Sequence, residues 1–109
     1  MNGGAFMKTE KQQYIYVLKL IPMLLDESNW TEKENMIVQE HFEKLQGLQR
    51  EGKLILAGRT LNMDTEGFGI VILEVDTENE ARELMEGDPA VKEGIMTAQL
   101  FPYRVALIK

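Results

Sequence analysis

The segment Phe68–Val75 constrains the fold more than any other stretch, because it reads as a strand that is apolar on both faces. Successive side chains of a strand point to opposite sides of the sheet. One face would carry Phe68, Ile70 and Ile72, and the other would carry Val71, Leu73 and Val75. Strands of this kind are normally buried on both sides. The sheet that contains this segment therefore needs a cover on each face.

Two helices are indicated by capping boxes, in which a Thr is followed three positions later by a Glu. Thr31-x-x-Glu34 predicts the start of a helix that ends at Gly52, a residue suited to the left-handed backbone of a helix end. Thr77-x-x-Glu80 predicts a shorter helix that ends at Gly87. Asp88-Pro89 then fits the cap and the first residue of one more short turn.

Four strand-like segments alternate with these helices. They are Tyr14–Ile21, Lys53–Thr60, Phe68–Val75 and Thr97–Ile108, the last interrupted near Pro102. The resulting order, βαββαβ, predicts an α+β fold, the ferredoxin-like sandwich of a four-stranded antiparallel sheet with two helices on one face. The length of 109 residues fits one domain, which we expect to span residues 11–109. Residues 1–10 are expected to be a disordered extension or one added for expression.

Two helices leave the second face of the predicted sheet uncovered. Pairing of the open faces of two copies would cover both and close a dimeric α/β barrel, so we expect a homodimer with Val71 or Leu73 near the centre of its interface. The alternative is a monomer with exposed aliphatic side chains, although large apolar patches usually mark an interaction site.

Composition excludes several classes of function. The chain has 12 Lys and Arg against 18 Asp and Glu, a net charge of −6, which argues against binding to nucleic acid. Glu66 stands where the RNA-recognition version of this fold has a basic residue, and Ile70 and Leu73 replace its stacking aromatics. With no cysteine and one histidine, the chain can form neither a zinc or iron–sulfur site with Cys ligands nor a metal site with several histidines. No apolar run approaches the length of a membrane span, and we expect a cytoplasmic protein that does not bind membranes.

His41 is the first candidate for chemistry, because it occupies the apolar stripe of the first helix together with Ile37, Leu45 and Leu48. It is either a hydrogen-bonded core histidine or a general base. Asp88 is explained equally well as a helix cap, but its second oxygen could orient an imidazole. We predict a hydrogen bond between one ring nitrogen of His41 and the Asp88 carboxylate.

Arg59 ends the second predicted strand, in the sequence Ala57-Gly58-Arg59-Thr60. It is either a solvated charge at a strand end or a clamp for a carboxylate or phenolate substrate. We expect Gly58, Arg59, Thr60 and Tyr103 to contact the substrate.

These pieces together resemble the YCII-related (YciI-like) family of small bacterial dimeric α/β-barrel proteins. The resemblance runs from about Tyr14 to Lys109 and is carried by His41-x-x-x-Leu45, Ala57-Gly58, Phe68-Gly69-Ile70, Glu80-Ala81-Arg82, Asp88-Pro89-Ala90-Val91 and Phe101-Pro102-Tyr103. It implies that His41 and Asp88 form a catalytic dyad. It also implies kinship with a dehydrochlorinase of chlorinated hydroxyquinols that uses neither metal nor organic cofactor. Many family members have the sequence Ala-Gly-Pro where this chain has Ala57-Gly58-Arg59.

The sequence is compatible with three functions. The leading hypothesis is a small cofactor-free lyase or hydrolase that acts on a small acidic or aromatic substrate, with His41 as acid and base and Asp88 as its orienting partner. The second is a cofactor-independent monooxygenase or isomerase of the same superfamily, which oxygen uptake would distinguish. The third is a ligand-binding module without turnover, whose binding would survive His41→Ala.

Overall fold

The structure is a computed structural model that describes residues 10–109. The extension expected at residues 1–10 lies outside the described residues, apart from Glu10.

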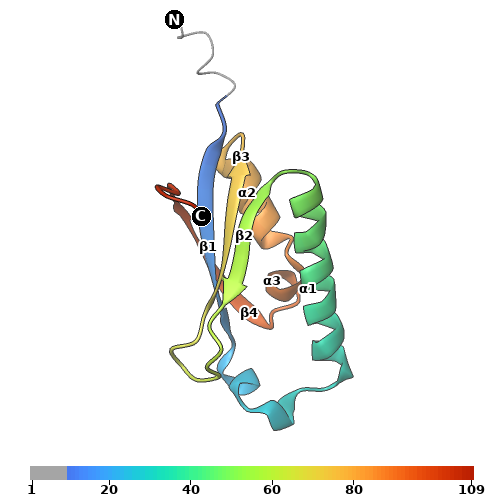
Figure 1. Cartoon of the computed structure of the whole chain (residues 1–109). Helices are drawn as coiled ribbons and strands as arrows, with labels where there is room; N and C mark the ends of the chain where they lie inside the picture. The colour runs from blue at the N-terminus through green and yellow to red at the C-terminus, as the bar shows by residue number, and fades with distance from the viewer. Residues whose placement is uncertain (1–9) are drawn as a thin grey trace, which may run out of the picture.

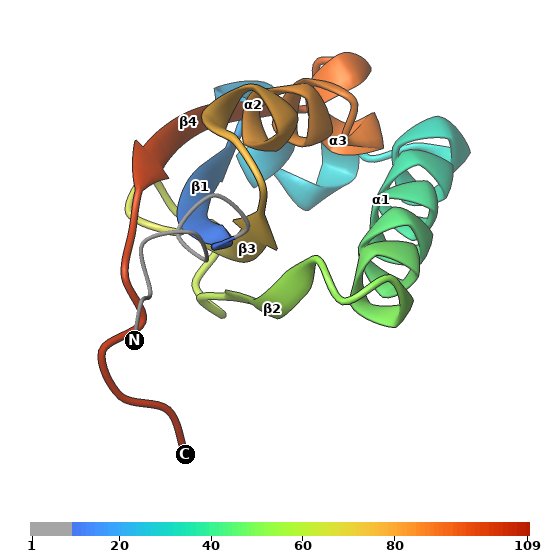
Figure 2. The same cartoon turned by 90° about the horizontal axis from the view of Figure 1, so that it is seen from above.

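The described chain folds into one antiparallel sheet with helices on one face (Figures 1 and 2). Its strands are β1 (Gln12–Leu20), β2 (Leu54–Arg59), β3 (Gly69–Val75) and β4 (Met96–Pro102), in the spatial order β2-β3-β1-β4. The helices are α1 (Glu32–Arg50), α2 (Glu78–Glu86) and the short α3 (Pro89–Lys92). This arrangement confirms the predicted ferredoxin-like α+β fold.

Local sequence signals explain where the long helix begins and ends. The Thr31 hydroxyl accepts from the backbone N–H of Lys33, and the Glu34 carboxylate accepts from the backbone N–H of Thr31, so the predicted capping box is present. Gly52 follows the last turn with a φ of 78°, a left-handed conformation that glycine adopts without a steric penalty. Both ends of α1 are therefore encoded locally.

Two segments differ from expectation. The last strand ends at Pro102 instead of continuing to Ile108, and beyond it the backbone N–H of Tyr103 still donates to the carbonyl of Gln13. β4 is an edge strand, and a proline there supplies no N–H to extend the ladder. The expected loop after β1 contains two single-turn 3-10 helices, η2 (Pro22–Leu25) and η3 (Glu27–Asn29).

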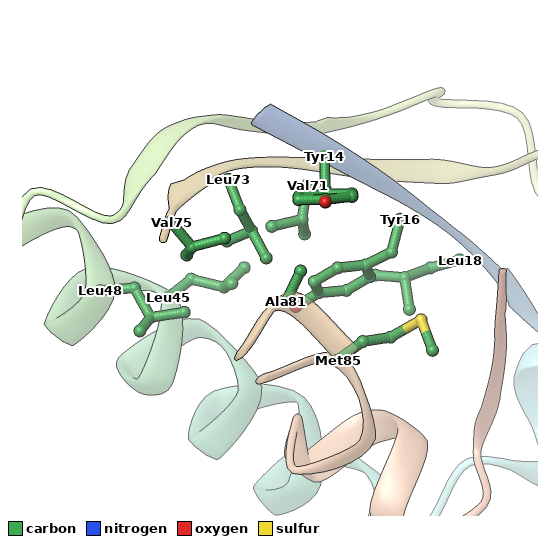
Figure 3. Close-up of a cluster of buried hydrophobic side chains, with 10 residues drawn as sticks. All are labelled: Tyr14, Tyr16, Leu18, Leu45, Leu48, Val71, Leu73, Val75, Ala81 and Met85. Atoms are coloured by element: carbon green, nitrogen blue, oxygen red, sulfur yellow. The ribbon is translucent and has the colours of Figure 1, made fainter. Parts of the chain in front are cut away.

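The main core lies between the sheet and the helices (Figure 3). It is formed by Tyr14, Tyr16 and Leu18 of β1, Val71, Leu73 and Val75 of β3, Leu45 and Leu48 of α1, and Ala81 and Met85 of α2. The inward residues of β1 lie opposite residues of β3 in the sheet, and Tyr16, for example, pairs with Val71. Every second side chain of the two central strands therefore points toward the helices, and together these side chains form one apolar layer.

This register corrects one expectation about the open face. Val71 and Leu73 are fully buried under the helices, so neither can lie at the centre of an interface on the opposite face. The open face instead carries Ile15 of β1, paired with Ile72 of β3 on one side and with Phe101 of β4 on the other. The prediction was wrong because both faces of β3 are apolar, and alternation alone does not show which one the helices cover.

Candidate functional site

Asp88 is the buried polar centre of the fold. Its side chain is fully enclosed, and it lies at the N-cap of α3, where Oδ1 accepts from the backbone N–H of Ala90 at 2.9 Å. The same oxygen is 2.6 Å from Nδ1 of His41, and Oδ2 accepts from the hydroxyl of Tyr16 at 2.7 Å. A buried charge needs such partners, because an unsatisfied one is very costly. Asp88 therefore serves as helix cap and as histidine partner at once.

His41 projects from α1 toward this carboxylate, so the predicted hydrogen bond between the two residues is present. A carboxylate offers only acceptor sites, so the hydrogen of this bond belongs to Nδ1 of the imidazole. Nε2 is then the ring nitrogen left with a free lone pair in the neutral side chain. His41 is 13% exposed and also lines a cavity, so Nε2 is the atom through which it can act on a bound molecule.

Tyr16 is the residue of this cluster that sequence reasoning missed. Burial raises the pKa of its phenol, and the negative charge of Asp88 and the hydrogen bond to it act in the same direction. The phenol is thus held neutral as a donor. The available signal was an inward-facing tyrosine on a central strand, because a buried hydroxyl usually requires a partner.

A cavity of about 690 Å³ lies between α1 and the sheet, with His41 in its wall. Its other walls come from the end of β1 with η2, from the end of β2, and from the loop that joins β2 to β3. Most of the lining is apolar, as expected for a site that binds small organic molecules. The loop is held in place at several points, for example by Lys19, whose Nζ donates to the carbonyl of Thr65 at 2.8 Å.

Three of the four expected substrate contacts line this cavity: Gly58, Arg59 and Thr60. Arg59 pairs with Gly69 of β3, and Gly69 in turn pairs with Leu18 of β1, so the three positions form one row across the sheet. A Cβ placed on Gly69 would lie 3.7 Å from that of Arg59 and 3.8 Å from that of Leu18. The missing side chain thus leaves room for about one methyl group in the cavity wall, beside the Cβ of Arg59.

Tyr103, the fourth expected contact, is not brought to the cavity. It follows β4 beside Gln13, at the start of β1, whereas the cavity is lined by Leu18 and Leu20 at the end of that strand. Within residues 10–109, no cluster of three or more His, Asp or Glu is arranged to hold a metal ion. None of the helices in the described part is long and apolar enough to span a membrane.

The sequence matches the YCII-related domain over residues 12–102. This chain belongs to the YCII-related family. Among solved structures, it is similar to 5-chloro-2-hydroxyhydroquinone dehydrochlorinase from Burkholderia phenoliruptrix in complex with 2,5-dihydroxybenzoquinone. The TM-score is 0.64 at 20% identity, over 84% of this chain and 93% of that one.

A second similar structure is an uncharacterized protein from Thermotoga maritima, with a TM-score of 0.51 at 16% identity, over 87% of this chain and all of that one. No curated protein matches the sequence. At these identities, the two structural matches establish a shared fold and nothing further.

Proposed function

We propose that this YCII-related protein is a small cofactor-free enzyme, a lyase or hydrolase, in which His41 is the general acid and base. The observation that carries the proposal is the hydrogen bond from Nδ1 of His41 to Asp88, a carboxylate that is itself fully buried and bonded to Tyr16. This arrangement fixes the tautomer of the imidazole and directs Nε2 at the cavity. A carboxylate in that position also stabilises the imidazolium that forms on proton transfer.

The chemistry that suits this arrangement is proton abstraction followed by elimination. Nε2 takes a proton from a substrate hydroxyl or an acidic C–H group, and the released electron pair forms a π bond while a leaving group such as halide departs with its bonding electrons. The imidazolium then gives its proton to the leaving group or to water, which restores the neutral base. The dehydrochlorinase activity of the similar Burkholderia structure supports this reaction class.

Arg59 completes the proposed site as the binding residue for an anionic substrate group. It lines the cavity with Gly58 and Thr60, and the only hydrogen bond of its guanidinium within the described residues is a long one of 3.3 Å from Nη1 to the carbonyl of Thr60. The remaining guanidinium donors are therefore free to bind a carboxylate or a phenolate in a bidentate manner.

The test is a turnover assay with 5-chloro-2-hydroxyhydroquinone as the probe, followed by chloride release, together with oxygen uptake and histidine ¹⁵N NMR. Because His41 is the only histidine, its two nitrogen resonances give the tautomer without assignment work. We expect chloride release without oxygen consumption, at least 10²-fold slower in His41→Asn, and an unprotonated Nε2. Gln39→Ala, at an exposed position two residues before His41 in α1, is the control and should turn over at the normal rate.

Other results would contradict the proposal. Oxygen consumption coupled to turnover would favour a monooxygenase. Probe binding without turnover, unchanged in His41→Ala, would favour a binding module. A hydrogen on Nε2 instead of Nδ1 would remove the base from the cavity.

We also propose that the protein is a homodimer that pairs through the open sheet face. The support is the apolar row of Ile15, Ile72 and Phe101 across three strands, in which Phe101 is 45% exposed. A stable interface of this kind should bury more than about 1,000 Å². Light scattering at micromolar concentration should give twice the chain mass of 12.5 kDa, and a monomer mass would rule the dimer out.

A further inference from the structure

The cavity beside His41 is several times larger than a single aromatic ring requires. Its volume is about 690 Å³, whereas a cavity of about 150 Å³ already encloses benzene. We propose that its ligand is an aromatic anion with an apolar body of about two rings, which binds Arg59 through its anionic group. The inference deepens the proposed function and rests on it, because it assigns a substrate class to the same site.

The polar groups on the cavity wall are mostly bonded to other parts of the protein. The Nζ atom of Lys19 donates to the carbonyl of Thr65, and the amide of Asn62 donates to the carboxylate of Asp64 at 2.7 Å. These bonds hold the β2–β3 loop in shape and leave few side-chain groups for a ligand. Nε2 of His41 and the guanidinium of Arg59 are the polar atoms best placed to receive one. A ligand with two polar groups and an apolar remainder matches this distribution.

The part of the cavity next to η2 is apolar. Trp30 lines it, and the indole Nε1–H donates to the carbonyl of Leu24 at 2.8 Å, so its polar atom is already satisfied. Pro22, Leu25 and Val38 line the same cavity. These side chains present only apolar surface to a ligand. This end of the cavity therefore suits a second aromatic ring better than a second charged group.

Gly69, which lines the cavity, lets a ligand approach the backbone of the sheet closely. Gly69 lies between Leu18 and Arg59 in the sheet, and the Cβ of an alanine there would meet its neighbours at 3.4–3.8 Å, within ordinary contact distance. The φ angle of Gly69 is not in the left-handed region, so the backbone does not require glycine. The position leaves room for about one methyl group beside the Cβ of Arg59, so the face of an aromatic ring can lie against the backbone there.

Isothermal titration calorimetry with three probes tests this assignment: 4-hydroxybenzoate, 6-hydroxy-2-naphthoate and 2-naphthol. The first two differ by one ring, and the last two differ by the carboxylate. We expect 6-hydroxy-2-naphthoate to bind about tenfold or more tightly than either of the others. Trp30 is the only tryptophan of the chain, so a change in its emission on binding would place the ligand in this cavity.

Three variants locate the two ends of the ligand. Val38→Phe narrows the apolar end and should weaken the naphthoate about tenfold while leaving 4-hydroxybenzoate unchanged. Met36→Phe is the control on the same helix, since Met36 is 54% exposed and lines a different groove. Arg59→Gln should reduce binding of the naphthoate to the level of 2-naphthol.

Equal affinity for one-ring and two-ring acids would overturn the inference, as would failure of all three probes to bind. Either result would still be compatible with His41 as the general base, provided that chloride release is lost in His41→Asn. The reverse outcome, a preserved preference for two rings with turnover that survives His41→Asn, would refute the proposed function and keep the ligand class.

Discussion

Replacement of Tyr16 by phenylalanine should destabilise the protein more than its small change in volume suggests. Tyr16 is fully buried, and its hydroxyl donates to Oδ2 of the enclosed Asp88 at 2.7 Å. Tyr16→Phe leaves that oxygen without this donor and with no access to water. An unsatisfied buried group costs about 1–3 kcal/mol, and a charged one lies at the upper end or beyond. We therefore expect a loss of about 3 kcal/mol, a large share of the ~5–15 kcal/mol typical of a domain.

Tyr14→Phe is the matched control for this substitution. Tyr14 lies on the same strand and faces the same core, but its hydroxyl donates to the neutral side chain of Gln12 near the sheet end. Its loss should cost less than about 1 kcal/mol.

Urea unfolding measures both variants, and an unchanged m-value shows that the comparison is sound. A cost for Tyr16→Phe no larger than that for Tyr14→Phe would refute the idea that the tyrosine supports Asp88. If the site works as proposed, Tyr16→Phe should also lower kcat more than it raises KM, because Asp88 then holds the imidazole less firmly.

Three further predictions concern pH, the anion site and the open face. The pKa of the Tyr16 phenol is raised above its ordinary value of 10.0, so the folded state keeps a proton that the unfolded chain loses. Stability should therefore fall as the pH rises above about 10, and in Tyr16→Phe the slope, measured by urea unfolding, should be shallower by up to ~1.4 kcal/mol per pH unit. Arg59→Lys should weaken binding of 6-hydroxy-2-naphthoate about tenfold by calorimetry, since an ammonium does not reproduce the guanidinium fork, and unchanged affinity would return Arg59 to the role of a surface charge. Ile70→Glu, on the open face, should shift light scattering from dimer toward monomer, and a variant that remains dimeric would place the interface elsewhere.

The features that could be predicted from sequence were those fixed by nearby residues or by the order of the elements. The capping box at Thr31 and the left-handed Gly52 involve only neighbours in the chain, so the helix ends were readable. The contact between His41 and Asp88 joins residues 47 positions apart, and it followed from the fold and the family resemblance together.

The features that could not be predicted depend on how elements cross. Alternation separates Tyr14, Tyr16 and Leu18 from Ile15 and Val17, but only the positions of the helices decide which of these two faces is inward and that Tyr16 meets Asp88. The choice between the two faces of β3 had one usable signal. Glu74 shares the open face with Ile70 and Ile72 and accepts from the amide of Gln13, which marks that side as the less buried one.

Asp88 links the proposed base to the order of a very short helix. One carboxylate oxygen meets both His41 and the backbone N–H of Ala90 in the first turn of α3, which has four residues. A helix of that length has little cooperativity of its own, so its opening is a local event that does not need global unfolding. Each opening would move the carboxylate and release the imidazole. The hydrogen-exchange rate of the Ala90 amide would then report the fraction of molecules in which the pair is assembled, and a ligand that binds only the assembled form would slow that exchange.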